Sequence, residues 1–193
     1  GGFQCWSNES CACRAAKTPR LISSMQWPAV VRHNGVFAQL RDHHAIAVGY
    51  CSSDAWVGDV GADESANGWH FRGRAILEGA LAQLAAEHGL TRASEVLFSG
   101  CSAGARGALY NLDALCAEAR RYAPDAACSA VLDSAWWTEL DARTPLQRAR
   151  GLPSVLEVAA ASSELYGPAM QLRRRQLRGD LTARASSPLR EPG

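Results

Sequence analysis

The sequence carries almost no net charge and no long hydrophobic run. Its 20 Lys and Arg residues are balanced by 19 Asp and Glu residues, which gives a formal net charge of +1 at pH 7. This balance argues against nucleic acid or an anionic membrane surface as a partner. No apolar stretch approaches the roughly 20 residues that a membrane-spanning helix needs. The length of 193 residues fits one domain of moderate size that does not span a membrane.

The sequence also lacks an initial methionine and the basic start and apolar stretch of a secretory signal peptide. It opens directly on Gly1 and Gly2. We therefore expect both ends to lie inside a longer protein, and the missing signal peptide then says little about the destination of that protein.

No pair of the seven cysteines has the spacing of a metal site. None shows the C-x-x-C pattern, and Cys11-x-Cys13 has no companion pair of histidines, so we expect neither a zinc site nor a cofactor. Cys5 and Cys11 instead enclose a short polar loop, as a disulfide would, and Asn8 within it begins a glycosylation sequon. Both features favour an oxidising, secretory compartment. The alternative is a cytosolic protein with several buried free thiols.

A G-x-S-x-G motif lies near the centre of the chain. Gly100-Cys101-Ser102-Ala103-Gly104 follows the apolar run Val96–Ser99 and opens an Ala- and Leu-rich helical pattern. A strand, a sharp turn and a helix form the layout of a nucleophile elbow, whose neighbours must be small for the backbone to turn tightly. The helix directs its positive N-terminal end at the serine. The motif therefore predicts that Ser102 is the nucleophile of a serine hydrolase.

Strands and helices alternate around this motif. Residues 1–44 show no clear period and are interpreted as loop and short turns. The expected elements are strands at Ala45–Tyr50, Val96–Ser99 and Ser129–Leu132, a long polar loop from Cys51 to about Arg72, and helices over about Gly73–His88 and Gly104–Arg121. Gly89 suits the left-handed position after the first of these helices. The alternation predicts an α/β fold with a parallel sheet flanked by helices.

The composition changes after about residue 140. Residues 141–193 are rich in Arg and Ala and include the basic run Arg173–Arg175, with a helix expected around Val155–Ala161 and disorder over about the last ten residues. We interpret the basic run as a solvated face rather than a targeting or nucleic-acid patch. The chain thus divides into residues 1–140, a partial catalytic domain, and residues 141–193, a basic helical or disordered tail.

Polar side chains gather where the three expected strands end. Asp54, Ser102 and Asp133 all follow a strand, and the chemistry of parallel sheets collects at this edge. The Ala103 N–H would supply one donor of an oxyanion hole, and Gly1-Gly2-Phe3 is the only segment before the first strand that fits the second. Position alone leaves Asp133 open between a catalytic acid and a structural carboxylate.

No histidine follows Ser102. The five histidines precede it, at His33, His43, His44, His70 and His88. A serine hydroxyl needs a base, usually a histidine that follows the serine and the acid in this fold. We favour a chain that ends before its histidine. An upstream histidine such as His70, or an inactive protein, are the two alternatives.

Several short motifs follow one another along the chain. They are Gly1-Gly2-Phe3-Gln4-Cys5 with Cys11, Arg20–Ser24 with Trp27-Pro28, Tyr50–Asp54 with Trp56 and Gly58, Phe71–Gly73, Gly100–Gly104, Asn111-x-Asp113 and Asp133-Ser134-x-Trp136. In this order they resemble the pectin acetylesterase family and, within it, the Notum branch of carboxylesterases. The resemblance covers about residues 1–140. It implies an α/β-hydrolase fold, incomplete at both ends, and a secreted enzyme that removes acyl groups from a polysaccharide or a protein.

The resemblance also implies roles for single residues. It makes Ser102 the nucleophile and Gly2, Phe3 and Ala103 the donors of the oxyanion hole. Trp137 would line the acyl pocket, where its large ring would favour acetyl over a long chain. Asp54 and Asp133 would belong to the site wall, since the catalytic Asp and His of the family lie beyond the matching stretch.

The leading hypothesis is a secreted serine carboxylic-ester hydrolase that works through an acyl-enzyme on Ser102. Its substrate would be an acylated polysaccharide or a lipidated protein. A non-catalytic module that binds an acyl group or a glycan is the alternative from another class. The Cys5–Cys11 loop and the segment Tyr50–Asp54 argue against a lipase or a peptidase.

Overall fold

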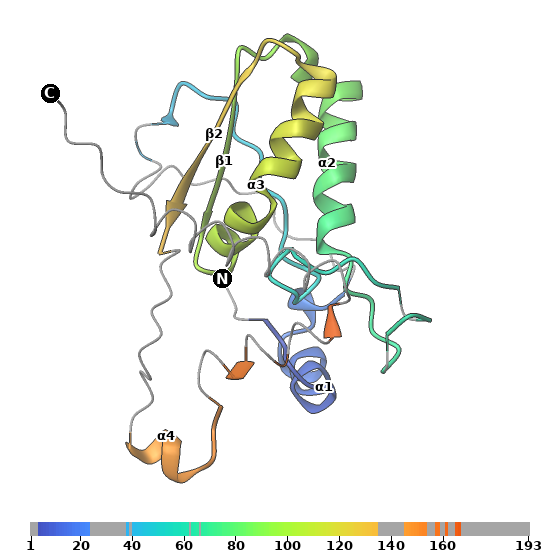
Figure 1. The fold of residues 1–193 in the computed structure, drawn as a ribbon, viewed down its shortest axis with the longest axis vertical. Helices are drawn as coiled ribbons and strands as arrows, with labels where there is room; N and C mark the ends of the chain where they lie inside the picture. Colours follow the sequence, from blue (N-terminus) through green and yellow to red (C-terminus); the bar gives the residue numbers. More distant parts are fainter. Residues whose placement is uncertain are drawn as a thin grey trace, which may run out of the picture.

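The sheet at the centre of the structure is the one that the motif predicts. The computed structural model describes residues 4–23, 38, 40–61, 63–65, 67–134, 145–153, 157–158, 161 and 165–166. Within these residues, β1 (Glu95–Cys101) and β2 (Ala127–Asp133) pair in parallel, and the two strands begin and end together. The helix α3 (Ala103–Tyr122) connects them and packs against both, as Figure 1 shows. The strand, helix and strand around Ser102 are therefore confirmed.

The helix before this unit is also confirmed. α2 (Gly73–Glu87) lies beside α3 (Figure 1) and ends at His88. Gly89 follows in the left-handed region, with φ 76°, and leads into the short 3₁₀ helix η3 (Leu90–Arg92). A glycine adopts this conformation without steric cost, which explains why the helix ends here.

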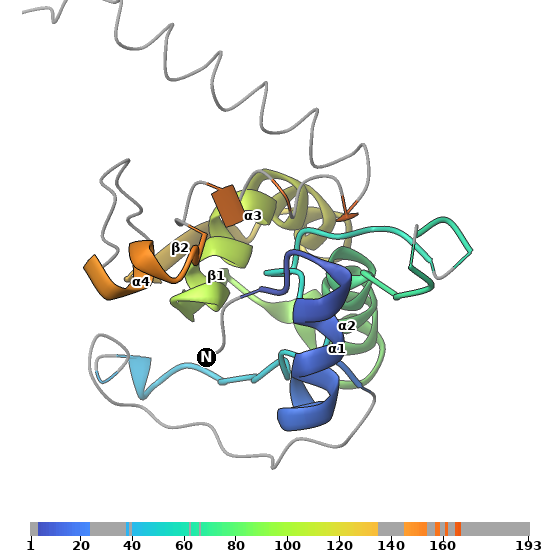
Figure 2. The same ribbon diagram turned by 90° about the horizontal axis from the view of Figure 1, so that it is seen from below.

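The interpretation of residues 1–44 as loop is wrong for one stretch. α1 (Asn8–Lys17) is a helix of ten residues, followed by the 3₁₀ helix η1 (Pro19–Leu21). A capping box starts it, because the Ser7 Oγ accepts from the Ser10 N–H (3.2 Å) and the Ser10 Oγ accepts from the Ser7 N–H (2.9 Å). In Figure 1, α1 lies below the end at which α2 begins, with loop segments between the two helices. The view from below in Figure 2 has α1 in front of α2.

The strand expected at Ala45–Tyr50 is not formed in the described structure. The segment has no ladder partner among the described residues, and its first four residues are exposed, with Ile46 at 56%. The His43 Nε2 lies 3.6 Å from the Glu95 Oε2 at the start of β1. An apolar run indicates a tendency to be buried, but a strand also needs a neighbour for its backbone groups.

Two clusters of buried side chains form the core of the described structure. The first joins Cys5, Cys11, Val57, Val60, Phe71 and Tyr166, and the second joins Tyr50, Trp56 and Ala103. Tyr166 is fully buried and stacks at a tilt on Phe71, with ring centroids 4.9 Å apart. A side chain from beyond residue 140 thus completes the core around the first disulfide.

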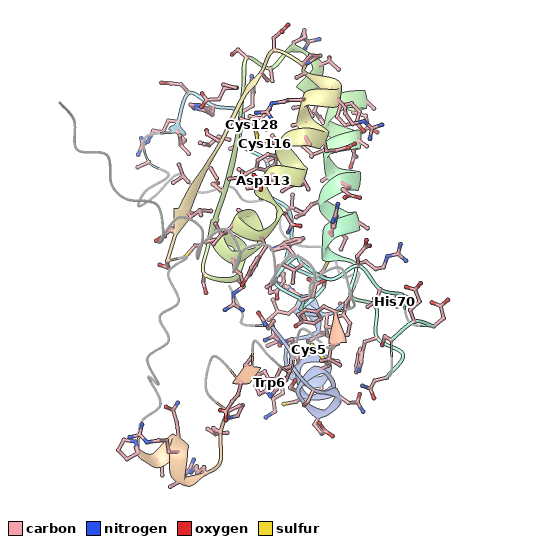
Figure 3. The ribbon with its side chains drawn as sticks, in the orientation of Figure 1. Cys5, Trp6, His70, Asp113, Cys116 and Cys128 are labelled. Atoms are coloured by element: carbon pink, nitrogen blue, oxygen red, sulfur yellow. A yellow bond between two sulfur atoms is a disulfide. The ribbon has the colours of Figure 1, made fainter. Side chains whose placement is uncertain are left out.

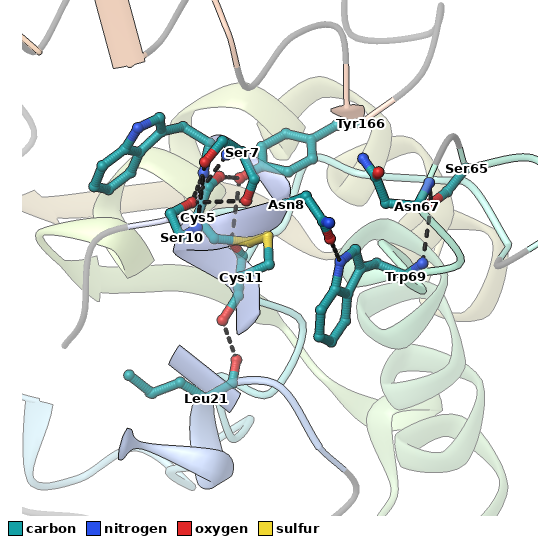
Figure 4. The surroundings of a disulfide bond; sticks show 12 residues. Cys5, Ser7, Asn8, Ser10, Cys11, Leu21, Ser65, Asn67, Trp69 and Tyr166 are labelled. Atoms are coloured by element: carbon teal, nitrogen blue, oxygen red, sulfur yellow. Dashed lines mark hydrogen bonds between the residues drawn. A yellow bond between two sulfur atoms is a disulfide. The ribbon is translucent and has the colours of Figure 1, made fainter. Parts of the chain in front are cut away.

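Four cysteines form two disulfides. Cys5–Cys11 links α1 to the strand-like segment before it (Figure 4), and Cys116–Cys128 links the end of α3 to β2 (Figure 3). Sequence spacing pointed to the first pair and missed the second. Closing a loop in this way stabilises a protein by about 2–4 kcal/mol, chiefly by restricting the unfolded chain.

α4 (Pro145–Ala149) lies beyond the carboxyl end of β2 in Figure 1 and buries no side chain. The basic run and the last residues lie outside the described residues, and so does most of the helix expected around Val155–Ala161. No helix of the described ranges is long and apolar enough to cross a membrane.

Candidate active site

Ser102 occupies a strained turn between β1 and α3. Its backbone has φ 57° and ψ −114°, a conformation that residues other than glycine rarely adopt. The Arg106 N–H donates to the Ser102 carbonyl (3.0 Å), so the helix begins immediately after this residue. Ser102 is half-buried rather than enclosed in the core. Strain of this kind costs about 1–3 kcal/mol and is typical of functional sites.

Gly100 makes this turn possible. A Cβ at Gly100 would lie 2.3 Å from the carbonyl carbon of Gly104 and 2.6 Å from the Ala105 nitrogen. Backbone atoms cannot move aside as a flexible side chain can, so only glycine fits where strand and helix cross. A Cβ at Gly104 would meet nothing within 4 Å. Of the two outer positions of the motif, position 100 therefore requires glycine and position 104 does not.

The end of β2 holds the turn in place. The Ser102 N–H donates to the Asp133 carbonyl oxygen (3.0 Å), which extends the parallel pairing by one bond beyond the strands. The Asp133 carboxylate is half-buried and accepts from the Ser134 hydroxyl (3.0 Å). Ser134 also has a positive φ of 57°. Through its backbone, Asp133 fixes the position of Ser102.

A second strained segment packs against the same helix. Ser53, Ala55 and Trp56 have φ between 53° and 64°, and all three are buried. The indole of Trp56 covers Gly107, where an added Cβ would lie 2.4 Å from the indole Cδ1. The Asn111 Nδ2 donates to the Trp56 carbonyl (2.7 Å). The loop that follows residue 50 is thus fastened to α3 one turn after the elbow.

Asp54 is the carboxylate at the centre of this loop. It is fully buried and accepts hydrogen bonds from the backbone N–H groups of Gly73 (2.8 Å), Trp56 (2.9 Å) and Gly58 (3.2 Å), and from the Ser52 hydroxyl. Gly73 is the first residue of α2, so the carboxylate also lies at the positive end of that helix. Asp54 therefore shapes the site by holding the loop, and its place in the site wall stays a prediction.

Burial raises the pKa of Asp54 above its ordinary value of 3.8, and the bonds from Ser52, Gly73 and Trp56 oppose this in part. Between the two pKa values, the folded protein holds a proton that the unfolded chain has released. The stabilisation of the folded state by this proton is complete below pH 3.8, the pKa of the unfolded chain, and is lost as the pH rises through the raised pKa of the folded state. Asp54→Asn should remove this slope, up to about 1.4 kcal/mol per pH unit. Chemical unfolding at a series of pH values measures it. Asp59→Asn, at an exposed carboxylate, should leave it unchanged, and an unchanged slope in Asp54→Asn would contradict the assignment.

No histidine of the described structure is hydrogen-bonded to Ser102. His43 faces Glu95 at the opposite end of β1, roughly 20 Å of strand away from the elbow. His70 is exposed on the loop before α2 (Figure 3), and His88 caps the far end of that helix.

Comparison with known proteins identifies the family to which the chain belongs. The sequence model of the Pectinacetylesterase family matches residues 1–164. The chain belongs to this family. It is 32% identical over 151 residues to the palmitoleoyl-protein carboxylesterase notum2 of Xenopus laevis, which covers 74% of this chain and 30% of that protein. It is 29% identical over 147 residues to the palmitoleoyl-protein carboxylesterase NOTUM of Homo sapiens, which covers 72% and 29%.

Solved structures give the same result. The Wnt deacylase Notum from Drosophila matches with a TM-score of 0.68 and 27% identity, over 86% of this chain and 49% of that one. This match confirms the predicted α/β-hydrolase fold. The chain spans about 30% of the length of the curated relatives and half of the solved one.

The described structure brings together only part of the site expected for a pectinacetylesterase. Ser102, Ala103 and Asp133 meet at the elbow, and Ala103 is buried against Tyr50 and Trp56. The other candidate residues Gly2, Phe3 and Trp137 lie outside the described residues. Asn8 is exposed on the first turn of α1, and its Oδ1 accepts from the Trp69 Nε1 (2.9 Å, Figure 4), so glycosylation there stays a prediction.

Sequence reasoning missed the residues that fasten this site from a distance. The Arg106 guanidinium on α3 is buried and donates to the Gln4 side chain, and burial lowers its pKa. The Tyr166 hydroxyl donates to the Cys5 and Ser53 carbonyls. The sequence showed only that an arginine follows the elbow motif at position 106, and it pointed neither to burial nor to a partner.

Proposed function

We propose that this chain carries the nucleophile of a carboxylic-ester hydrolase that works through an acyl-enzyme on Ser102. The observation that carries the proposal is the left-handed backbone of Ser102 at the junction of β1 and α3. Ser102 is the N-cap residue of a helix of 20 residues, so it directly precedes the first N–H groups of that helix. Those N–H groups have no acceptor within the helix and can bind a developing negative charge.

The chemistry has two steps. The base takes the proton of the Ser102 hydroxyl as the oxygen attacks the ester carbonyl. The C–O bond to the alcohol then breaks, and the base gives that proton to the leaving alcohol. Water then attacks the acyl-serine and releases the acid. Ala103, with Gly2 and Phe3, would donate N–H groups to the oxyanion in both steps. We propose that the base and its acid belong to the part of the relatives' length that this chain does not span.

The substrate is an ester of an acyl group with a polysaccharide or a protein. The family name and the names of the relatives cover both, since one denotes a pectin deacetylase and the others palmitoleoyl-protein carboxylesterases. We propose secretion of the whole protein, supported by the two disulfides and by the exposed sequon at Asn8.

Active-site labelling tests the proposal. The full-length protein should react with a fluorophosphonate probe, and mass spectrometry should locate the label on Ser102. Cys101→Ala is the matched control, because Cys101 is an exposed thiol next to the serine. The label should persist in Cys101→Ala and disappear in Ser102→Ala. A protein that binds an acyl glycan but takes up no label would instead be the non-catalytic module.

Acyl-chain preference gives a second test. We propose that Trp137 lines the acyl pocket, where a large indole would shorten the space for the chain. The full-length enzyme should then hydrolyse acetyl esters faster than octanoyl esters of the same alcohol, by about tenfold or more, since each methylene that fails to fit costs about 1 kcal/mol or more. Trp137→Ala should narrow this ratio. Faster octanoyl turnover by the unaltered enzyme would contradict the role of Trp137 and leave the labelling result standing.

A further inference from the structure

Trp56 lies against the start of the helix that follows Ser102. Its side chain packs with Tyr50 and with Ala103, the residue directly after the nucleophile. It also covers Gly107, where an added Cβ would lie 2.8 Å from both the Cβ and the Cγ of Trp56. Trp56 and Ala103 are both buried, with 6% and 4% exposed. One side chain therefore supports α3 at its first residue and again one turn later.

The backbone of Trp56 is held in an unfavourable conformation. Its φ of 64° is rare for a bulky residue, and such a conformation persists only where the surrounding contacts fix it. The Trp56 N–H donates to the Asp54 carboxylate (2.9 Å), and the Trp56 carbonyl accepts from the Asn111 Nδ2 (2.7 Å). The same buried amide donates to the Gly107 carbonyl (2.9 Å). Asn111 thus joins the two residues that meet in this contact, and the indole is fixed against the helix.

We propose that Trp56 is a positioning residue, which holds the first turn of α3 so that the Ala103 N–H stays in place beside the Ser102 hydroxyl. This inference depends on the proposed function, in which that N–H donates to the oxyanion, as the residue after the nucleophile does in an elbow. Oxyanion donors act only when they lie about 2.7–3.1 Å from the charge that develops, and a misplacement of about 1 Å can cost about 100-fold in rate. β2 fixes the start of the turn, since the Ser102 N–H donates to the Asp133 carbonyl (3.0 Å), and Trp56 fixes its continuation into the helix.

Gly107→Ala and Trp56→Ala test this role in the full-length enzyme. The first pushes the indole and the helix apart, and the second removes the support. Each should lower kcat about 10- to 100-fold and leave KM within about threefold, because the oxyanion forms only in the transition state. Affinity for a trifluoromethyl ketone, which forms a tetrahedral oxyanion on the serine, should fall in parallel with kcat. The methyl group of Gly107→Ala has room once the indole is gone, so the double variant should be no slower than Trp56→Ala alone.

A conservative variant and two matched controls complete the experiment. Trp56→Phe keeps a ring against Gly107, so it should recover most of the loss and lower kcat and inhibitor affinity only about 3- to 10-fold. Trp69→Ala removes an indole that packs against the other core cluster. Gly79→Ala adds a methyl group to α2, where it would meet nothing within 4 Å. Both controls should keep kcat within about twofold.

Thermal unfolding identifies any variant that does not fold. Full kcat in folded Gly107→Ala or Trp56→Ala, additive losses in the double variant, or a loss confined to KM would overturn the inference. If neither of these single variants folds, Trp56→Phe decides the question, and full kcat in Trp56→Phe would then overturn it. Failure of the proposed function would look different, since the unaltered enzyme would show no activity that depends on Ser102.

Discussion

Replacing Ser102 with alanine should lower kcat for ester hydrolysis by about 10⁴-fold or more in the full-length enzyme. In the proposed mechanism the Ser102 hydroxyl forms the acyl-enzyme, and removing the nucleophile of a serine hydrolase leaves only the weak contribution of the oxyanion donors. The loss should appear in kcat, since an alanine at the turn still leaves the acyl pocket in place. Initial rates with an acetyl ester and a titration with product measure the two effects separately.

Ser134→Ala is the control for this substitution. Ser134 has the same φ of 57° at the end of the neighbouring strand, and its hydroxyl is exposed and bonded to Asp133. The change removes the same group from a second serine with positive φ at the same edge of the sheet. We expect kcat within about tenfold of the unaltered enzyme. Equal losses in the two variants would show that the effect arises from the strained turns and not from a nucleophile.

The elbow and the elements around it could be predicted because their signals are local. An apolar run, two glycines around a serine and a helical stripe of Ala and Leu all fall within about 25 residues, and β1 and α3 follow them. Gly89 likewise marks the end of α2 by a property of its own backbone. Patterns of this kind need no knowledge of distant parts of the chain.

α1 escaped prediction because its signals are polar. Only Cys11 of its ten residues is buried, so no apolar stripe marks the helix. The signals were instead the capping box of Ser7 and Ser10, Glu9 in the first turn, and Arg14 and Lys17 in the last turn, which suit the helix dipole. The strand predicted at Ala45–Tyr50 was wrong for the opposite reason. The segment is apolar, but no strand pairs with it in the described structure.

The contacts that fasten the site could not be predicted at all. Arg106 reaches Gln4 across 102 residues, and Tyr166 reaches Cys5 across 161. No periodicity connects positions so far apart, and a charged residue on a helix is normally expected at the surface. These contacts arise only when the fold brings the elbow, the first residues and the region after residue 140 together.

Gly100→Ala should destabilise the fold by about 3 kcal/mol and lower kcat by about 100-fold. The added methyl would lie 2.3 Å from the Gly104 carbonyl carbon and 2.5 Å from its oxygen, both backbone atoms at the start of α3. The clash can be relieved only by moving the strand end away from the helix. That movement would shift Ser102 relative to Ala103 and to the Asp133 carbonyl that holds it. Thermal and chemical unfolding measure the first effect, and initial rates measure the second.

Gly104→Ala tests whether the clash is specific to the crossing of β1 and α3 or whether the motif accepts no residue larger than glycine at either position. The methyl would meet nothing within 4 Å, and position 104 is helical, so alanine should raise stability by about 0.5–1 kcal/mol and leave kcat within about threefold. The two variants add the same atom to the two outer positions of one motif. Opposite signs in stability would therefore assign the constraint to the crossing of β1 and α3. Equal destabilisation would show that the motif tolerates a methyl group at neither position, and the constraint could then not be assigned to the crossing of β1 and α3.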